Sequence, residues 1–203
     1  MALALAAAGC ATPRSPGPAA DQEVALAAYR ERSARLADLE RWQVRGRVAI
    51  QGPEESGQVR VRWEQTRGRS HMVVSNPFGQ TLLDVEHGTG GLRVRDDRGA
   101  TYRGWDARLV LRRRLGWWVP IERLAHWILG TGAERAPQAL DASGRPRKLK
   151  AGPWRVAFQA YSRVEGVWLP RRLEVHRDGI SLRLHVDSWS LAWPSDGRQG
   201  PAA

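Results

Sequence analysis

The stretch WQVRGRVAI, residues 42–50, alternates apolar residues and a glycine with mostly polar side chains. Successive side chains of an extended strand point to opposite faces, so this alternation predicts a β-strand with one buried and one solvated face. Gly52-Pro53 then supplies a turn, and residues 59–64 repeat the alternation. Together the two stretches predict a pair of half-buried antiparallel strands.

Short runs of the same kind, separated by turn residues, continue along the chain. Asn-Pro-Phe-Gly at residues 76–79 and Gly-Thr-Gly-Gly at residues 88–91 separate three of them, and Asp178-Gly179 predicts a tight hairpin. Closely spaced strands with turns between them are typical of an antiparallel meander. The further predicted strands lie at residues 72–75, 81–87, 92–96, 154–160, 173–175 and 182–189.

Three segments show helical spacing instead. A helix is expected from Asp21, which can cap it, and two more between residues 106 and 130, the second opened by Pro120 and stopped by Gly130. Residues 135–150 form a polar stretch between elements. The fold class predicted is therefore mainly β (α+β): a strongly curved antiparallel sheet carrying about three helices. Helices that only partly fill the concave side of such a sheet leave an apolar cavity.

Composition agrees with one globular domain. The chain has 203 residues, of which 42% are hydrophobic and 26% charged. Ten tryptophans stand against two phenylalanines and three tyrosines. Because indole is the bulkiest side chain and carries an N–H, these tryptophans point to an apolar cavity that they would line.

The formal net charge of +11 raises nucleic acid as a partner. Almost all the basic residues are arginines, however, and they are spread along the chain and alternate with apolar residues in the predicted strands. The solvated face of a sheet is therefore the preferred interpretation, and the predicted partners include no nucleic acid. Attraction to anionic lipid head groups or to an acidic protein remains compatible with this distribution.

Cys10 is the only cysteine, which excludes an internal disulfide. An apolar run ending in small residues precedes it, as in the signal of a bacterial lipoprotein, so residues 1–10 are interpreted as a truncated lipoprotein signal with Cys10 as the lipid anchor. Residues 11–20 contain three prolines and are expected to be a linker. Residues 21–191 are the predicted domain, and residues 192–203 a polar tail.

Catalytic and metal-binding patterns are not found in the sequence. The five histidines form no H-x-x-x-H pair, and there is no G-x-S-x-G nucleophile motif. Asp96-Asp97 and Glu54-Glu55 are neighbouring carboxylates that strand geometry directs to opposite faces. We therefore expect no enzymatic activity, no metal site and no cofactor.

The turn at residues 76–79 carries an unusual side chain at its tip. Pro77 sets the first central position of a turn and Gly79 relieves its exit, which leaves Phe78 at the tip of a tight loop. Burying a phenylalanine is worth roughly 1.5–3 kcal/mol, enough to help a loop enter a bilayer or a partner's groove. Folding of Phe78 back onto the sheet is an equally acceptable alternative at this level.

These residues together resemble the LolB family. The resemblance is carried, in order, by WQVRGR at residues 42–47, WEQ at 63–65, SNPFG at 75–79 and a helix from residue 121 that ends in WILG at 127–130. It extends from about residue 21 to 191. It implies an open, unclosed antiparallel β-barrel with helices as a lid over a hydrophobic cavity, and a lipid-anchored location on the periplasmic face of the outer membrane.

The family's roles fall on particular residues of this chain. The resemblance implies a membrane-insertion loop at Pro77, Phe78 and Gly79. It implies that the chain, as a monomer, accepts acylated lipoproteins from a LolA-like periplasmic chaperone and inserts them into outer-membrane lipid. A periplasmic carrier of another lipid or hydrophobic ligand is the main alternative. The residues implied for the acyl-binding cavity are Trp63, Leu124, Trp127, Ile128 and Trp154.

Overall fold

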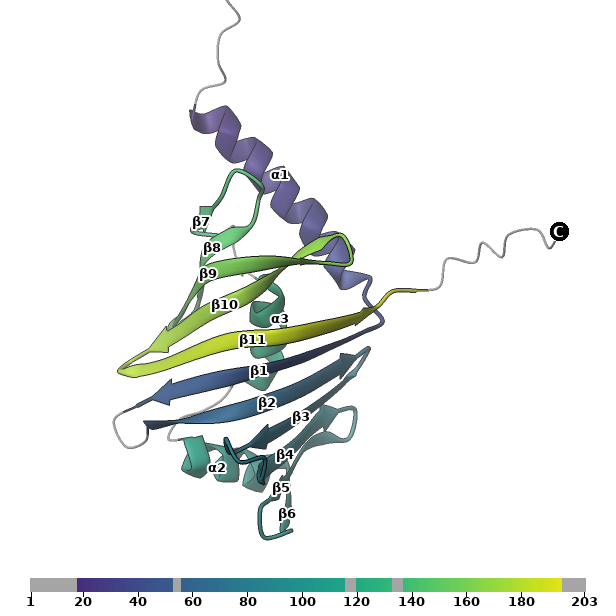
Figure 1. Ribbon diagram of the computed structural model, residues 1–203, viewed down its shortest axis with the longest axis vertical. Coiled ribbons are helices and arrows are strands. Elements are labelled where there is room, and N and C mark those ends of the chain that lie inside the picture. The colour runs from purple at the N-terminus through teal and green to yellow at the C-terminus, as the bar shows by residue number, and fades with distance from the viewer. Residues whose placement is uncertain (1–17, 53–55, 116–119, 133–136, 195–203) are drawn as a thin grey trace, which may run out of the picture.

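A computed structural model describes residues 18–52, 56–115, 120–132 and 137–194. Its main element is one antiparallel sheet of eleven strands (Figure 1). The strands are β1 (Arg41–Gln51), β2 (Ser56–Thr66), β3 (Arg69–Ser75), β4 (Thr81–Gly88), β5 (Gly91–Asp96), β6 (Thr101–Arg103), β7 (Ala139–Leu140), β8 (Pro146–Ala151), β9 (Trp154–Val164), β10 (Val167–Arg177) and β11 (Ile180–Ala192).

The sheet is open. Its order is β6-β5-β4-β3-β2-β1-β11-β10-β9-β8-β7, and the two end strands, β6 and β7, do not pair with each other among the described residues. The chain therefore forms an unclosed barrel, in which the first long strand, β1, pairs with the last, β11, at the centre. This confirms the fold class predicted from the alternation of residues 42–50.

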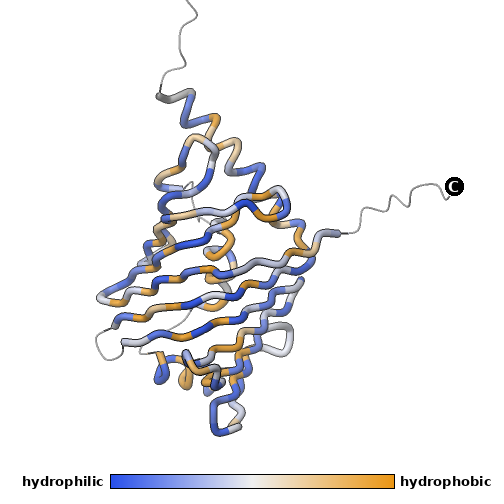
Figure 2. The backbone as a smooth tube through the Cα atoms, viewed as in Figure 1, coloured by the Kyte–Doolittle hydropathy of each residue, from blue (hydrophilic) through white to orange (hydrophobic). Residues whose placement is uncertain are grey.

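The alternation of β1 and β2 is reproduced in their burial. Trp42 and Val44 are buried whereas Arg45 and Arg47 are exposed, and Trp63 is buried opposite Val44. Figure 2 shows the same alternation of hydrophobic and hydrophilic residues along the long strands. The concave side thus carries the apolar residues, and the convex side carries the arginines.

Gly46 lies at an irregularity of the β1–β11 pairing. The partners step from Ser188 opposite Arg45 to Val186 opposite Gly46, so Asp187 is an extra residue, a β-bulge. A Cβ on Gly46 would lie 2.6 Å from the carbonyl oxygen of His185 and 3.1 Å from a methyl of Leu184. Only a residue without a side chain fits there.

We therefore expect Gly46→Ala to destabilise the protein by about 1–3 kcal/mol, the usual cost of overpacking. Urea unfolding followed by circular dichroism measures this change. Gly57→Ala is the matched control, because Gly57 also lies in a long strand but a Cβ there would meet nothing within 4 Å. Equal stability of the two variants would contradict the assignment of Gly46 to a close backbone contact.

Three helices accompany the sheet: α1 (Pro18–Ala37), α2 (Gly104–Leu115) and α3 (Ile121–Leu129). In Figure 1, α3 lies behind the central strands, α2 lies beside β5 and β6 at the lower end of the sheet, and α1 crosses the end where β7 and β8 lie. Both α2 and α3 pack against the apolar, concave side of the sheet. Pro120 precedes the first residue of α3, and Gly130 ends that helix in the left-handed conformation with φ of 69°. Both boundaries confirm the sequence prediction.

A half-buried arginine ties α1 to the end of α3. The Arg32 guanidinium donates to the carbonyl oxygens of Gly130 at 3.1 Å and Trp168 at 3.0 Å, and also to that of Leu129. Burial lowers the pKa of this guanidinium. Because the last carbonyls of a helix are its negative end, a cation there is favourable. Arg32 thus fixes the far end of α3 against α1 and the sheet.

Several boundaries differ from the prediction. The first helix begins at Pro18, so the last three residues of the expected linker are helical, and Ala192 belongs to β11 and not to the tail. The polar stretch at residues 135–150 contains β7 and β8, which were not predicted. In β8 only Pro146, Leu149 and Ala151 are buried, and their spacing is not a regular alternation. The strand is defined by its pairing with β9, which a local sequence pattern does not show.

None of the described helices is both long enough and apolar enough to cross a membrane. Cys10, the residue predicted to be the lipid anchor, lies outside the part of the chain that the structure describes, as do the rest of residues 1–17 and residues 195–203.

Candidate functional site

An apolar cavity lies between the concave side of the sheet and the helices α2 and α3. Its volume is about 140 Å³, and its lining consists of apolar side chains and one glycine. Four of the five residues expected to form a cavity line it together: Trp63, Leu124, Trp127 and Ile128. The remaining lining residues come from β1, β2, β3, β10, β11 and the end of α2: Val44, Gly46, Val48, Ile50, Val59, Val61, Met72, Val74, Leu115, Leu173, Val175, Leu182 and Leu184.

The fifth expected residue, Trp154, is placed one layer away. It is buried in the same core, and its ring centroid lies 5.8 Å from that of Trp127, but it is not part of the cavity lining. The alternation of residues 154–160 correctly predicted that Trp154 faces inward. It could not show that Trp127, from α3, comes between Trp154 and the cavity.

Two indole N–H groups near the cavity differ in their environment. Trp63 donates its Nε1–H to the Ser70 hydroxyl at 2.7 Å, which fixes that ring. The Nε1 of Trp127 is buried and has no hydrogen-bond partner among the described residues. An unpaired buried donor costs about 1–3 kcal/mol, so Trp127 is held by packing alone. The lid helix is therefore attached to the sheet by apolar contacts on this side.

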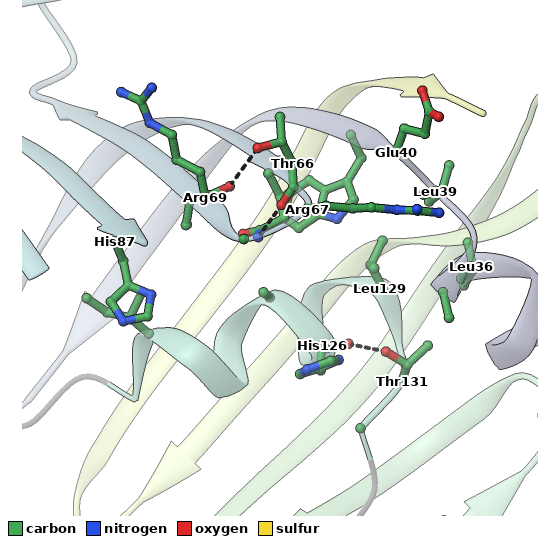
Figure 3. A pocket seen from close by; sticks show the side chains of 18 of the residues that line it. Leu36, Leu39, Glu40, Thr66, Arg67, Arg69, His87, His126, Leu129 and Thr131 are labelled. Carbon is green, nitrogen blue, oxygen red and sulfur yellow. Dashed lines mark hydrogen bonds between the residues drawn. The ribbon is translucent and has the colours of Figure 1, made fainter. Parts of the chain in front are cut away.

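A second, larger hollow opens where α3 meets the end of α1 and the β2–β3 hairpin (Figure 3). Its volume is about 610 Å³. Leu36, Leu39 and Leu129 supply apolar walls, whereas His126 and Arg69 make its rim polar. Sequence analysis missed this hollow, because its walls come from the ends of elements far apart in the chain.

Two tryptophans and α3 separate the two cavities. Trp42 lines the larger hollow, Trp63 lines the smaller cavity, and their rings meet edge to face with centroids 5.1 Å apart. On α3, Leu129 faces the larger hollow and Ile128 the smaller cavity. A shift of α3 would therefore change both spaces at once.

The loop between β3 and β4 presents Phe78 to solvent. The Phe78 side chain is 96% exposed, which excludes the alternative that it folds back onto the sheet. Pro77 and Gly79 shape the turn as expected: the Gly79 amide donates to the Asn76 carbonyl at 3.0 Å, and Gly79 has a positive φ of 91°.

Asn76 organises this loop in a way that sequence analysis did not identify. Its side-chain oxygen accepts hydrogen bonds from the backbone amides of Phe78 and Gln80, both at 3.0 Å. Asparagine at the start of a turn commonly makes such hydrogen bonds, so the role of Asn76 could have been predicted from the sequence. The loop is thus held by its own hydrogen bonds, and Phe78 projects from a rigid base.

The carboxylates of Asp84 and Glu86 on β4 are paired with arginines. His71, Asp84 and Glu86 come close enough together to ligate a metal ion. Glu86, however, contacts Arg93 at 2.6 Å, and the resulting hydrogen bond lowers the pKa of its carboxyl group. Arg95 lies 3.6 Å from Asp84. These guanidinium groups already occupy the carboxylates, so the group is interpreted as an ion-pair network.

The neighbouring carboxylates Asp96 and Asp97 also have structural partners. Asp96 accepts from the amides of Arg98 and Ala100 within its own turn. Asp97 pairs with Arg114 at 2.8 Å and so connects this turn to α2. Neither carboxylate is positioned as an acid or base beside the apolar cavity.

Comparison with known proteins places this arrangement in one family. Residues 40–189 match the family model described as outer membrane lipoprotein LolB. This region contains the whole lining of the smaller cavity and the Phe78 loop, whereas part of the wall of the larger hollow, including Leu36 and Leu39, precedes it. The chain belongs to the LolB family.

Named LolB relatives support the assignment over most of the chain. The outer-membrane lipoprotein LolB of Halorhodospira halophila is 33% identical, with 85% of each chain covered. That of Nitrosococcus oceani is 30% identical over 94% of each chain. LolB proteins are lipoprotein-binding and transport proteins and are not known as an enzyme family. The family is one of lipid-anchored proteins on the periplasmic face of the outer membrane, and this chain shares that location.

Solved structures show the same fold at low sequence identity. A LolA superfamily protein from Nitrosomonas europaea superposes with a TM-score of 0.55 at 14% identity and covers 85% of this chain and 93% of its own. A putative outer membrane lipoprotein-sorting protein domain from Vibrio parahaemolyticus gives a TM-score of 0.51 at 12% identity, covering 82% of this chain and 91% of its own. The open sheet with a helical lid is therefore the LolA-like fold.

Proposed function

We propose that this LolB-family chain is an outer-membrane lipoprotein receptor that takes acylated lipoproteins from a LolA-like periplasmic chaperone and inserts them into the outer membrane. It acts as a monomer, and Cys10 is its lipid anchor. The observation that carries the proposal is the cavity beneath α3, which is lined by apolar side chains and one glycine. Such a lining can bind hydrocarbon and offers little to a polar ligand.

The size of the cavity indicates how binding proceeds. At about 140 Å³ it is close to an engineered apolar cavity of roughly 150 Å³ that holds benzene. A long acyl chain needs more room, so α3 has to move away from the sheet as cargo enters. The contacts of Trp127 and Ile128 with the sheet are apolar, and an acyl chain can replace them like for like.

Moving an acyl chain from one apolar cavity to another costs little free energy. Each methylene that leaves water contributes about 0.8 kcal/mol, and a chain that passes directly from one cavity to another keeps that contribution throughout. Direction then comes from the difference in affinity between donor and acceptor. Phe78, exposed on the β3–β4 loop, is proposed to enter the bilayer surface and assist release there.

A second candidate is a periplasmic carrier of another lipid or small hydrophobic ligand. The small volume of the cavity favours it, because a compact ligand would fit without movement of α3. Such a carrier would bind hydrophobic ligands but would not receive lipoproteins from a chaperone.

The test is a transfer assay with the full chain carrying Cys10→Ser, so that its own acylation does not interfere. A LolA-type chaperone loaded with a tagged lipoprotein is mixed with it, and the tag is followed by pull-down and size exclusion. We expect the tag to move to this chain, because its cavity offers the acyl chains an equivalent apolar environment. A tag that stays on the chaperone, with the acceptor folded, would contradict the proposal and favour the carrier.

A further inference from the structure

Four arginines form a square on the convex face of the sheet. Arg45 and Arg47 lie on β1, and Arg60 and Arg62 lie opposite them on β2, with Arg45 paired to Arg62 and Arg47 to Arg60. All four side chains are exposed. β1 and β2 are central strands, and α2 and α3 lie on the other face of the sheet (Figure 1). We call these four residues the arginine square.

Among the residues that the structure describes, only one carboxylate pairs with the square. Asp187, the bulged residue of β11, accepts from Arg47 at 2.8 Å. None of the other three arginines has an acidic partner within salt-bridge distance among the described residues, in contrast to the arginines beside Glu86 and Asp84 on the same sheet. Like charges directly opposite each other on neighbouring strands destabilise a sheet. The square therefore carries uncompensated charge that an external anion would offset.

The square adjoins the Phe78 loop. One open hollow on the convex face is lined by all four arginines together with Ser75, Gly79 and Thr81, which flank Phe78 in the β3–β4 connection. Ser75 is the direct cross-strand partner of Arg60. An exposed aromatic tip and a cluster of guanidinium groups thus occupy the same side of the molecule.

We propose that the arginine square binds the phosphate groups of anionic lipids at a membrane surface while Phe78 enters the bilayer beside it. Guanidinium is suited to this, because its planar set of N–H donors matches phosphate oxygens two at a time. One phenylalanine holds a protein weakly at a membrane, and basic residues near an anionic surface add to that attraction. This inference deepens the proposed membrane delivery and rests on it for its purpose.

The experiment measures binding of the cargo-free full chain with Cys10→Ser to vesicles by sedimentation at low salt. Vesicles of phosphatidylethanolamine with phosphatidylglycerol are compared with vesicles of phosphatidylethanolamine and phosphatidylcholine. We expect the protein with the intact arginine square to bind the vesicles that contain phosphatidylglycerol at least tenfold more tightly than those that contain phosphatidylcholine. The variant Arg45→Gln/Arg60→Gln/Arg62→Gln should lose at least tenfold of its binding to the anionic vesicles. Raising the salt concentration should remove the same difference.

A control variant removes the same charge elsewhere. Arg155→Gln/Arg163→Gln/Arg171→Gln changes three exposed arginines of β9 and β10 and should retain anionic binding. The square variant should melt at an equal or higher temperature at low salt, because repulsion between opposite arginines is relieved. The variant Arg45→Lys/Arg60→Lys/Arg62→Lys should keep most of the binding to anionic vesicles, since lysine keeps the positive charge.

Three results would overturn the inference: equal binding of the wild-type square to both kinds of vesicle, equal loss in the control variant, or unchanged vesicle binding of the square variant. If that variant instead failed to accept cargo from a LolA-like chaperone, the square would be assigned to an acidic protein partner. Because empty vesicles and cargo-free protein are used, the result does not depend on whether transfer from the chaperone occurs.

Discussion

Leu124→Glu is expected to reduce the affinity for acylated lipoprotein at least 100-fold. Leu124 lies on α3 and lines the apolar cavity with Trp127 and Ile128. An acyl chain that enters this space would bury the new carboxylate without a partner, at a cost of several kcal/mol. Retention of a tagged lipoprotein after mixing with the loaded chaperone measures the effect.

Leu124→Met is the control for this prediction. Methionine is apolar and similar in volume, so cargo binding should stay within a few-fold. Leu124 is only partly buried in the cargo-free protein, which lets the glutamate remain hydrated, so melting of the Leu124→Glu variant should change much less than its cargo binding. If the glutamate variant held cargo normally, the acyl chains would have to bind elsewhere, and the larger hollow beside Leu39 and His126 would be the next site to test.

The second large effect is expected for Phe78→Glu, which should slow delivery of bound lipoprotein into vesicles by tenfold or more while uptake from the chaperone is unchanged. The substitution removes an insertion worth roughly 1.5–3 kcal/mol and places a charge where hydrocarbon is expected. Phe78 belongs to neither cavity lining, so cargo binding has no reason to change. Transfer of a labelled lipoprotein from this chain to sedimenting vesicles gives the rate.

Two matched variants distinguish the side chain from the charge. Phe78→Leu keeps an apolar tip and should deliver nearly as well. Gln80→Glu adds the same charge two residues away while leaving the hydrogen bond from its backbone amide to Asn76 in place. Because Phe78 is almost fully exposed, none of these changes should alter the melting temperature. Normal delivery by Phe78→Glu would exclude the loop from the membrane step.

The two variants test opposite ends of one process. Leu124→Glu acts where hydrocarbon is held, and Phe78→Glu acts where it is released. An α3 that moves to admit cargo would be expected to disturb the Arg32 contacts at its far end, since these join Gly130 to α1 and Trp168. Cargo binding and the position of α1 are thus expected to be linked.

The sequence by itself determined the long strands, the three helices and the faces that they bury, but not the short strands β6, β7 and β8. The alternation of residues 42–50 predicted β1 and its buried side, and Pro120 and Gly130 bounded α3 correctly. The turn around Asp178-Gly179 was also predicted, and both residues have the positive φ that such a hairpin requires. These features depend on backbone preferences and periodicity within a few residues, which a local pattern records.

Only the tertiary structure decided how these faces meet. It placed Trp127 between Trp154 and the cavity, left Phe78 in solvent, and gave the cavity a volume of about 140 Å³. The register of β1 against β2 brought Arg45 next to Arg62, and pairing with β9 made a strand of a polar stretch. Such neighbours are separated along the chain, and packing and strand register fix their distances, so no local pattern in the sequence contains them.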